Sequence, residues 1–186
     1  MTASTGPAEG IPATAGAECI HDADAVIAAC AAMAGAIDEH LDGAACLAVV
    51  LLQGGIIPAG QILPRVRSPL ELDSVRLTRY RNTTQGGAIE WQGWLSTALA
   101  GRSVLLIDDI LDEGHTLAAV AARCRAEGAA EVLSAVLVDK RHARKSAQIR
   151  PDFVGLEVDD RYVFGFGMDY RGWHRNAPGI YAVEGD

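Results

Sequence analysis

The stretch from Val104 to Leu117, VLLIDDILDEGHTL, constrains the fold of this 186-residue chain more than any other. Four apolar residues at 104–107 predict a buried strand, because a short apolar run bounded by turn residues suits the interior of a sheet. Two adjacent carboxylates, Asp108 and Asp109, follow this strand, and a third, Asp112, precedes a glycine turn and a helical pattern. The order of strand, acidic edge, turn and helix is typical of an α/β domain.

The turn in this stretch has the features of an anion site. Gly114 permits a tight turn and a close approach of backbone to phosphate. The amides of the first helical turn, around His115 and Thr116, have no partner inside the helix and can bind an anion. The preceding carboxylates suit a hard divalent cation and hydroxyl groups. Together these features indicate a sugar-phosphate ligand, and the alternative is a plain buried strand followed by an acidic helix cap.

Composition and charge restrict the classes of protein to consider. With 49% hydrophobic and 22% charged residues over 186 positions, the chain is expected to form one globular domain with a substantial core. The 24 acidic residues outnumber the 16 basic ones, and the net charge of −8 disfavours general binding to nucleic acid. No apolar run approaches the ~18 residues of a membrane span.

The N-terminal residues and the cysteines bear on the location of the protein. Residues 1–17, rich in Ala, Thr, Gly and Pro, lack the basic start and apolar core of a signal peptide and predict a flexible tail. The four cysteines are scattered, and Cys30 and Cys124 lie in apolar helical patterns. Buried free thiols are therefore expected, which favours a reducing cytoplasm.

Alternating apolar runs and helical patterns predict a mainly parallel sheet of about five strands, flanked by helices. Helices are expected at 23–41, at 56–63, and after the glycine turn as far as Gly128. Strands are expected at 46–52, 72–80, 104–107, 132–138 and 162–166. A polar, glycine-rich loop at 81–91 separates two of these strands, and loops of that length often serve as lids.

Two segments carry a family resemblance. The order of apolar strand, two acids, two apolar residues and Asp-x-Gly-x-Thr within 104–116 resembles the phosphoribosyl-pyrophosphate (PRPP) signature of the type I phosphoribosyltransferases. Residues 152–182, DFVGLEVDDRYVFGFGMDYRGWHRNAPGIYA, are similar to the tail of the bacterial hypoxanthine-guanine branch. The resemblance implies a parallel sheet flanked by helices in a single domain, residues 18–186, with a small hood built from both termini.

The resemblance also implies roles for the signature and for a glycine loop after the first strand. Asp108 and Asp109 would face the ribose hydroxyls and the Mg²⁺ shell of PRPP, and Asp112 would be the general base for the purine N7 proton. The ribose 5′-phosphate would be bound by Glu113, Gly114, His115 and Thr116. The pyrophosphate would be bound by Gln53, Gly54, Gly55 and Arg175.

The C-terminal half of the resemblance implies which base is bound. Lys140 would donate to the purine O6, Tyr162 would stack on the base, and the backbone of Val163 would meet its N1/N2 edge. An ammonium donor at that position favours an oxo group over the amino group of adenine. Asp169 would belong to a second Mg²⁺ site.

The mobile lid of the family would include Arg79 and Tyr80. Three residues depart from the family pattern. Gln53 stands where lysine is frequent, Arg79 replaces a serine of the lid, and Glu113 replaces a threonine. The missing lysine charge bears on pyrophosphate affinity and on subunit contacts. The negative side chain of Glu113 must turn away from a bound phosphate.

These expectations define a purine-salvage reaction: transfer of the phosphoribosyl group from PRPP to hypoxanthine or guanine, giving IMP or GMP and pyrophosphate. Mg²⁺, a cytoplasmic location and a homo-oligomer, either dimer or tetramer, are expected with it. The alternatives are an enzyme that prefers xanthine or uracil, or a PRPP-sensing regulator such as a repressor or RNA-binding attenuator. A regulator is disfavoured because the chain is acidic, has one short basic loop and carries no appended DNA-binding domain.

Overall fold

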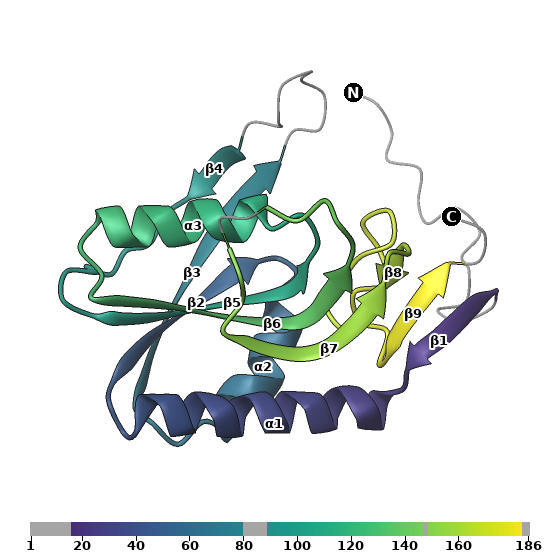
Figure 1. Cartoon of the computed structure of the whole chain (residues 1–186), viewed down its shortest axis with the longest axis horizontal. Helices are drawn as coiled ribbons and strands as arrows, with labels where there is room; N and C mark the ends of the chain where they lie inside the picture. The colour runs from purple at the N-terminus through teal and green to yellow at the C-terminus, as the bar shows by residue number, and fades with distance from the viewer. Residues whose placement is uncertain (1–15, 80–88, 147–148, 184–186) are drawn as a thin grey trace.

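The computed structural model of the chain describes residues 16–79, 89–146 and 149–183 (Figure 1). Its helices are α1 (Ala23–Leu41), α2 (Ile56–Ile62), the 3-10 helix η1 (Leu63–Arg65) and α3 (His115–Ala126). Its strands are β1 (Ala17–His21), β2 (Cys46–Leu52), β3 (Leu70–Arg79), β4 (Ile89–Gly93), β5 (Ser103–Leu111), β6 (Glu131–Arg141), β7 (Phe153–Asp159), β8 (Val163–Phe164) and β9 (Ile180–Val183). Among these described helices, none is long and apolar enough to cross a membrane.

The central sheet has the strand order β4-β3-β2-β5-β6-β7. Its neighbouring strands are parallel except at one edge, where β4 pairs antiparallel with β3. Helices α1 and α2 cover one face of the sheet and α3 covers the other (Figure 1). The predicted parallel sheet flanked by helices is therefore confirmed.

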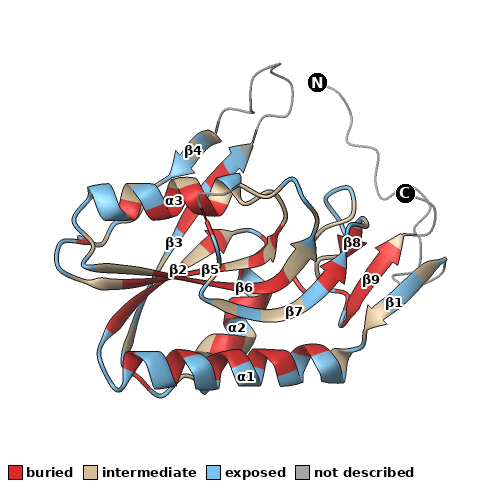
Figure 2. Ribbon diagram, viewed as in Figure 1, coloured by how far each residue is buried: buried red, intermediate tan, exposed pale blue. Residues whose placement is uncertain are grey.

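Strand β5 illustrates why both faces of the sheet are buried. Leu105 and Ile107 pack in the cluster that includes α1 and α2. Val104 and Leu106, which point the other way, pack in the cluster that includes α3. A parallel strand covered on both faces needs this nearly continuous apolar sequence. Figure 2 shows the same pattern, with buried residues along the central strands and on the helix sides that face them.

A second sheet, β1-β9-β8, is antiparallel and lies beside the central sheet, at the right of Figure 1. We call this sheet the hood. Strand β1 comes from the start of the described chain, and β8 and β9 come from its end. Ala17, which falls in the predicted tail at 1–17, is the first residue of β1, and residues 1–15 lie outside the described residues.

Several element boundaries match the predictions and others differ. The predictions of a helix at 23–41 and a strand at 46–52 are confirmed to the residue. The prediction that the central strand ends at 107 is wrong, because its ladder with β6 continues to the pair Leu111↔Asp139. Asp108 and Asp109 therefore belong to the strand itself rather than to the turn after it.

The edges of the central sheet differ most from the sequence-based expectation. Strand β4 begins at Ile89, inside the expected 81–91 loop, of which 81–88 lie outside the described residues. Strand β7, which was not predicted, pairs with β6 over 153–159. Both strands lack a continuous apolar run, because β4 reads IEWQG and a glycine and a glutamate divide the apolar residues of β7, FVGLEVD. The strand expected at 162–166 is reduced to the two residues of β8.

Candidate active site

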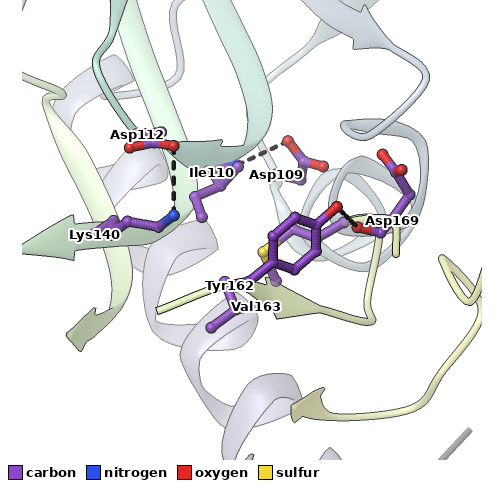
Figure 3. Close-up of a pocket in the computed structure, with 8 residues that line it drawn as sticks. Asp109, Ile110, Asp112, Lys140, Tyr162, Val163 and Asp169 are labelled. Carbon is purple, nitrogen blue, oxygen red and sulfur yellow. Dashed lines mark hydrogen bonds and ion pairs between the residues drawn. The ribbon is translucent and has the colours of Figure 1, made fainter. Parts of the chain in front are cut away.

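A cavity of about 210 Å³ lies where the carboxyl ends of β5 and β6 meet the segment that leads through β8 (Figure 3). Its lining residues are Asp109, Ile110, Asp112, Lys140, Tyr162, Val163, Met168 and Asp169. All of them except Ile110 and Met168 are residues that the sequence singles out. Pockets that bind drug-sized ligands measure roughly 300–1,000 Å³, so this smaller cavity suits a single heterocyclic base. Ligand sites of parallel α/β sheets lie at this end of the strands.

Strand register brings Asp112 and Lys140 together. Leu111 on β5 pairs with Asp139 on β6, so the residues that follow them, Asp112 and Lys140, are neighbours. Lys140 Nζ lies 3.4 Å from Asp112 Oδ2 and donates to it (Figure 3). Burial raises the pKa of Asp112, but the hydrogen bond from His142 and the charge of Lys140 outweigh it and leave the pKa below its usual value.

His142 is a third member of this group and was missed by the sequence reasoning. Its Nε2 lies 2.7 Å from Asp112 Oδ1, and only 3% of its side chain is exposed. In the sequence it belongs to KRHARK, which is typical of a solvated basic loop. Ile110 and Met168 were missed for a different reason, since an apolar residue beside an acidic one carries no signal for a ligand cavity.

Asp108 and Asp109 form a carboxylate pair near the C-terminal end of β5, in which Asp108 is partly buried and Asp109 is buried. Asp109 is 9% exposed, and its backbone amide donates to Asp108 Oδ1 at 3.0 Å. Burial and the neighbouring charge of Asp109 raise the pKa of Asp108 well above its usual value. Burial also raises the pKa of Asp109, although the nearby Arg175 opposes the shift. A cation or a set of hydroxyl donors would compensate this pair, and the pair therefore fits a divalent metal.

Arg175 joins two of the three carboxylates that are predicted to face metal, Asp109 and Asp169. One guanidinium nitrogen lies 3.7 Å from Asp109 Oδ2, and the other lies 2.6 Å from Asp169 Oδ1. The first nitrogen also donates to the carbonyl of Gly167 at 2.6 Å. The residue predicted to contact pyrophosphate thus lies beside the predicted metal carboxylates.

Tyr162 and Asp169 are linked on the hood side of the cavity. The Tyr162 hydroxyl donates to the Asp169 backbone carbonyl at 3.2 Å (Figure 3). The Tyr162 ring packs edge-on against Tyr170 at 5.5 Å and is 39% exposed, so part of its surface is open to a ligand. The next residue, Val163, is buried and lies in β8, which pairs with β9.

The glycine loop after β2 packs tightly against Asp109. A Cβ atom on Gly54 would lie 1.9 Å from Asp109 Oδ2, and one on Gly55 would lie 2.7 Å from the Ile107 carbonyl. The Gly55 amide donates to Leu51 at 2.9 Å, so that amide is already used within the loop. Gln53 is exposed, and the Leu52–Gln53 peptide bond is cis. Anion binding by this loop would rest mainly on the amides of Gln53 and Gly54.

The turn after β5 has the conformation that the sequence predicts. Gly114 has φ = 82° and precedes the first residue of α3, His115. A Cβ atom on Gly114 would lie 2.7 Å from Ile149 Cγ2, so both the backbone angle and the packing require glycine. Glu113 Oε2 lies 3.7 Å from His115 Nε2, and the helix continues through the partly buried Thr116.

The predicted lid residues fall at the limit of the described chain. Arg79 is the last residue of β3, and its side chain is not among the described parts. Tyr80 lies outside the described residues. Strand β4 pairs with β3 from Arg79↔Ile89 onward, so the two strands form the base of any lid.

Within the described ranges, no group of three or more His, Cys, Asp or Glu side chains could hold a metal ion by itself. Mg²⁺ often uses only one or two protein carboxylates, with water and substrate phosphates as its other ligands. The carboxylate pair near the end of β5 matches this mode of coordination.

A mainly parallel sheet with a carboxylate pair near the end of its central strand and a glycine turn before a helix is suited to bind a sugar phosphate together with a divalent cation. The family model for the phosphoribosyl transferase domain matches residues 16–171. The chain therefore belongs to the phosphoribosyltransferase family.

The chain's relatives within that family include bacterial hypoxanthine-guanine phosphoribosyltransferases, which confirms the resemblance stated from the sequence. The enzyme of that name from Bacillus subtilis is 36% identical over 135 residues, covering 72% of this chain and 74% of the relative. The one from Staphylococcus epidermidis is 28% identical over 158 residues, covering 84% and 88%. The crystal structure of a hypoxanthine phosphoribosyltransferase from Staphylococcus aureus has the same fold, with a TM-score of 0.84, 24% identity and coverage of 90% and 91%.

Proposed function

We propose that this protein transfers the 5-phosphoribosyl group from PRPP to hypoxanthine or guanine, giving IMP or GMP and pyrophosphate. The observation that carries the proposal is the cavity in which Asp112, Lys140 and Tyr162 converge. An acceptor for a proton, a donor for an oxo group and an aromatic surface are the three contacts that a 6-oxopurine requires. The names of the relatives support the same reaction.

The proposed step forms one bond and breaks one. Purine N9 attacks C1′ of PRPP, and the C1′–oxygen bond breaks with its electron pair leaving on pyrophosphate. The N7 proton of the base passes to Asp112 and from there to solvent. A positioned base of this kind contributes about 10²–10⁴-fold to the rate.

Base selection is assigned to Lys140, Tyr162 and Val163. Lys140 is 12% exposed and contacts Asp112 at the long distance of 3.4 Å, so a purine O6 can replace that contact. Adenine offers an amino group at this position, which cannot accept a hydrogen bond from the ammonium. Tyr162 stacks on the base, and Val163 meets its N1/N2 edge through the backbone. Stacking adds affinity without discriminating strongly between bases.

The two phosphate groups, the metal and the lid are assigned to the rest of the site. The amides of the first turn of α3, with Gly114 and Thr116, bind the 5′-phosphate, and the 53–55 loop with Arg175 binds pyrophosphate. Mg²⁺, held by Asp108, Asp109 and Asp169 together with PRPP, would neutralise the charge that develops on pyrophosphate. Arg79 and Tyr80 close over the substrates and exclude water.

One panel of assays tests this function. Pyrophosphate release is measured with PRPP, Mg²⁺ and, in parallel, hypoxanthine, guanine, xanthine, adenine or uracil. We expect turnover with hypoxanthine and guanine and at least about 100-fold lower kcat/KM with adenine and uracil. Turnover confined to xanthine would assign the alternative specificity. No turnover with any base, together with retained PRPP binding, would favour a PRPP-sensing regulator.

The proposal includes a cytoplasmic homo-oligomer. The four cysteines are free, with Cys30, Cys46 and Cys124 buried, and burial raises the pKa of each of these three to about 11. Free thiols favour a reducing compartment. The expected dimer or tetramer stays a prediction, and light scattering of the purified protein measures it.

A further inference from the structure

His142 lies one residue beyond β6, and its side chain is buried although its neighbours Arg141 and Ala143 are exposed. Only 3% of its side chain is exposed, so the ring is held inside the turn that carries it. A polar ring buried at the end of a strand needs partners for both nitrogens.

The two nitrogens of His142 have distinct partners. The backbone amide of Arg144 lies 3.1 Å from Nδ1. An amide can only donate, so Nδ1 accepts and the ring hydrogen is on Nε2. Nε2 therefore donates to Asp112 Oδ1 at 2.7 Å. The turn itself is anchored, because the Arg144 guanidinium holds both oxygens of Asp160 at 2.7 and 2.9 Å.

Asp112 depends on these donors for its orientation. Its side chain is 43% exposed, so packing alone does not fix the plane of the carboxylate. The bond from His142 occupies Oδ1 and leaves Oδ2 on the side of Lys140, which lines the cavity. Lys140 cannot provide this orientation during the reaction if it turns to the purine O6.

We propose that His142 is a positioning residue for Asp112: it holds the carboxylate through Oδ1 so that Oδ2 meets the purine N7 proton. This inference rests on the proposed function, in which Asp112 is the base. The buried ring acts through Asp112 and does not itself touch the substrate. Misplacing a catalytic group by about 1 Å can cost about 10²-fold in rate.

Two polar substitutions separate this role from a purely structural one. In His142→Asn the side-chain amide reaches only the position of Nδ1, so it can accept from Arg144 but cannot reach Asp112. In His142→Gln the amide nitrogen reaches the position of Nε2 and can donate to Asp112. The control is His40→Asn, because His40 pairs with Glu131 at the opposite end of β6.

The measurements are kcat and KM with hypoxanthine and PRPP, together with the melting temperature of each variant. We expect His142→Asn to lower kcat by about 10- to 100-fold with little change in the KM for PRPP, and His142→Gln to stay within about threefold of wild type. The His40→Asn variant should match wild type. Wild-type kcat in His142→Asn would overturn the proposal. So would equal loss of kcat in both His142 variants with a lowered melting temperature, which would mean a structural role.

The two proposals fail in different ways. A wild-type protein without turnover on any base would remove the proposed function and, with it, the role of His142. A wild-type protein with normal turnover and an unaffected His142→Asn variant would remove only the role of His142.

Discussion

At the scale of single residues, the site is organised by a few short contacts between segments far apart in the chain. Asp112 contacts Lys140 and His142, which lie 28 and 30 positions later. The aspartate and the lysine could be predicted because their motifs are distinctive in the sequence. His142 could not, because its function depends on a turn that buries the ring and directs one nitrogen to Asp112.

The first prediction concerns the general base. Asp112→Asn should lower kcat by about 10²–10⁴-fold, because an amide cannot accept the N7 proton. The melting temperature should stay close to wild type, since this side chain is 43% exposed. Steady-state kinetics with hypoxanthine and thermal unfolding measure both. Asp24→Asn, at an exposed position in the first turn of α1, is the control. Near-normal kcat in Asp112→Asn would exclude the base role.

The second prediction concerns the glycine loop. Gly54→Ala should destabilise the protein by about 1–3 kcal/mol and lower PRPP turnover, because the new methyl group overlaps the Asp109 carboxylate. Gly60→Ala is the matched control, since a Cβ atom there meets nothing within 4 Å and the residue lies in α2. Alanine favours a helix by about 0.5–1 kcal/mol over glycine, so the control should be neutral or stabilising. Equal melting temperatures for the two variants would contradict this packing argument.

At the scale of helices and strands, an element can be predicted when its own residues carry a recognisable pattern. The boundaries of α1 are predicted to the residue because its apolar residues recur at helical spacing and Asp22 caps it, accepting from the Ala25 amide at 2.9 Å. The edge strands β4 and β7 form because they pair with β3 and β6, and pairing with a neighbouring strand leaves no recognisable pattern in so short a sequence.

The third prediction concerns the hydrogen bonds that join α1 to the segment before β3. Asp38 accepts from the backbone amides of Arg67 and Ser68 at 2.9 Å, and these bonds lower its pKa from 3.8 to about 2. A lowered pKa in the folded state means that the carboxylate stabilises the fold above pH 3.8 and that this contribution is lost as the pH falls toward 2. Asp38→Asn should therefore melt below wild type at neutral pH.

The difference in melting temperature between wild type and Asp38→Asn should narrow as the pH falls from 3.8 toward 2, which thermal unfolding across that range measures. Glu39→Gln, at the exposed neighbouring position of α1, should show no comparable difference. A constant difference in melting temperature at every pH would mean that the hydrogen bonds of Asp38 do not depend on its carboxylate charge.

At the scale of the whole molecule, the cavity joins the central sheet to the hood. The fold class, the order of the motifs and most of the lining residues could be predicted from the sequence. The bridge from Arg175 to Asp109 and Asp169 could not be predicted, because it depends on how the segment between β8 and β9 folds back onto the central sheet.

The fourth prediction tests the contribution of β1 to the hood. A chain that begins at residue 16 keeps β1 and should retain wild-type turnover, in line with the predicted tail. A chain that begins at residue 22 lacks β1, which leaves β9 unpaired on one side. We expect its melting temperature to fall by at least about 4 °C, or about 1–2 kcal/mol for a chain of this size.

The KM of the shorter chain for hypoxanthine should rise as well, because β9 pairs with β8, whose Val163 lines the cavity. Thermal unfolding and kinetics of the two truncated proteins measure these effects side by side. Identical behaviour of both would show that the site does not depend on β1.

The close packing around Asp109 has a consequence for redesign of the protein. A Cβ atom on Gly167 would lie 2.3 Å from the Gly54 carbonyl and 3.2 Å from Asp109 Cβ, so the segment after β8, the glycine loop and the central strand meet at one point. The segment proposed to select the base is therefore not an interchangeable module. A chimaera that imports this segment from a relative with different base preference must keep glycine at position 167, because any side chain there would meet the Gly54 carbonyl.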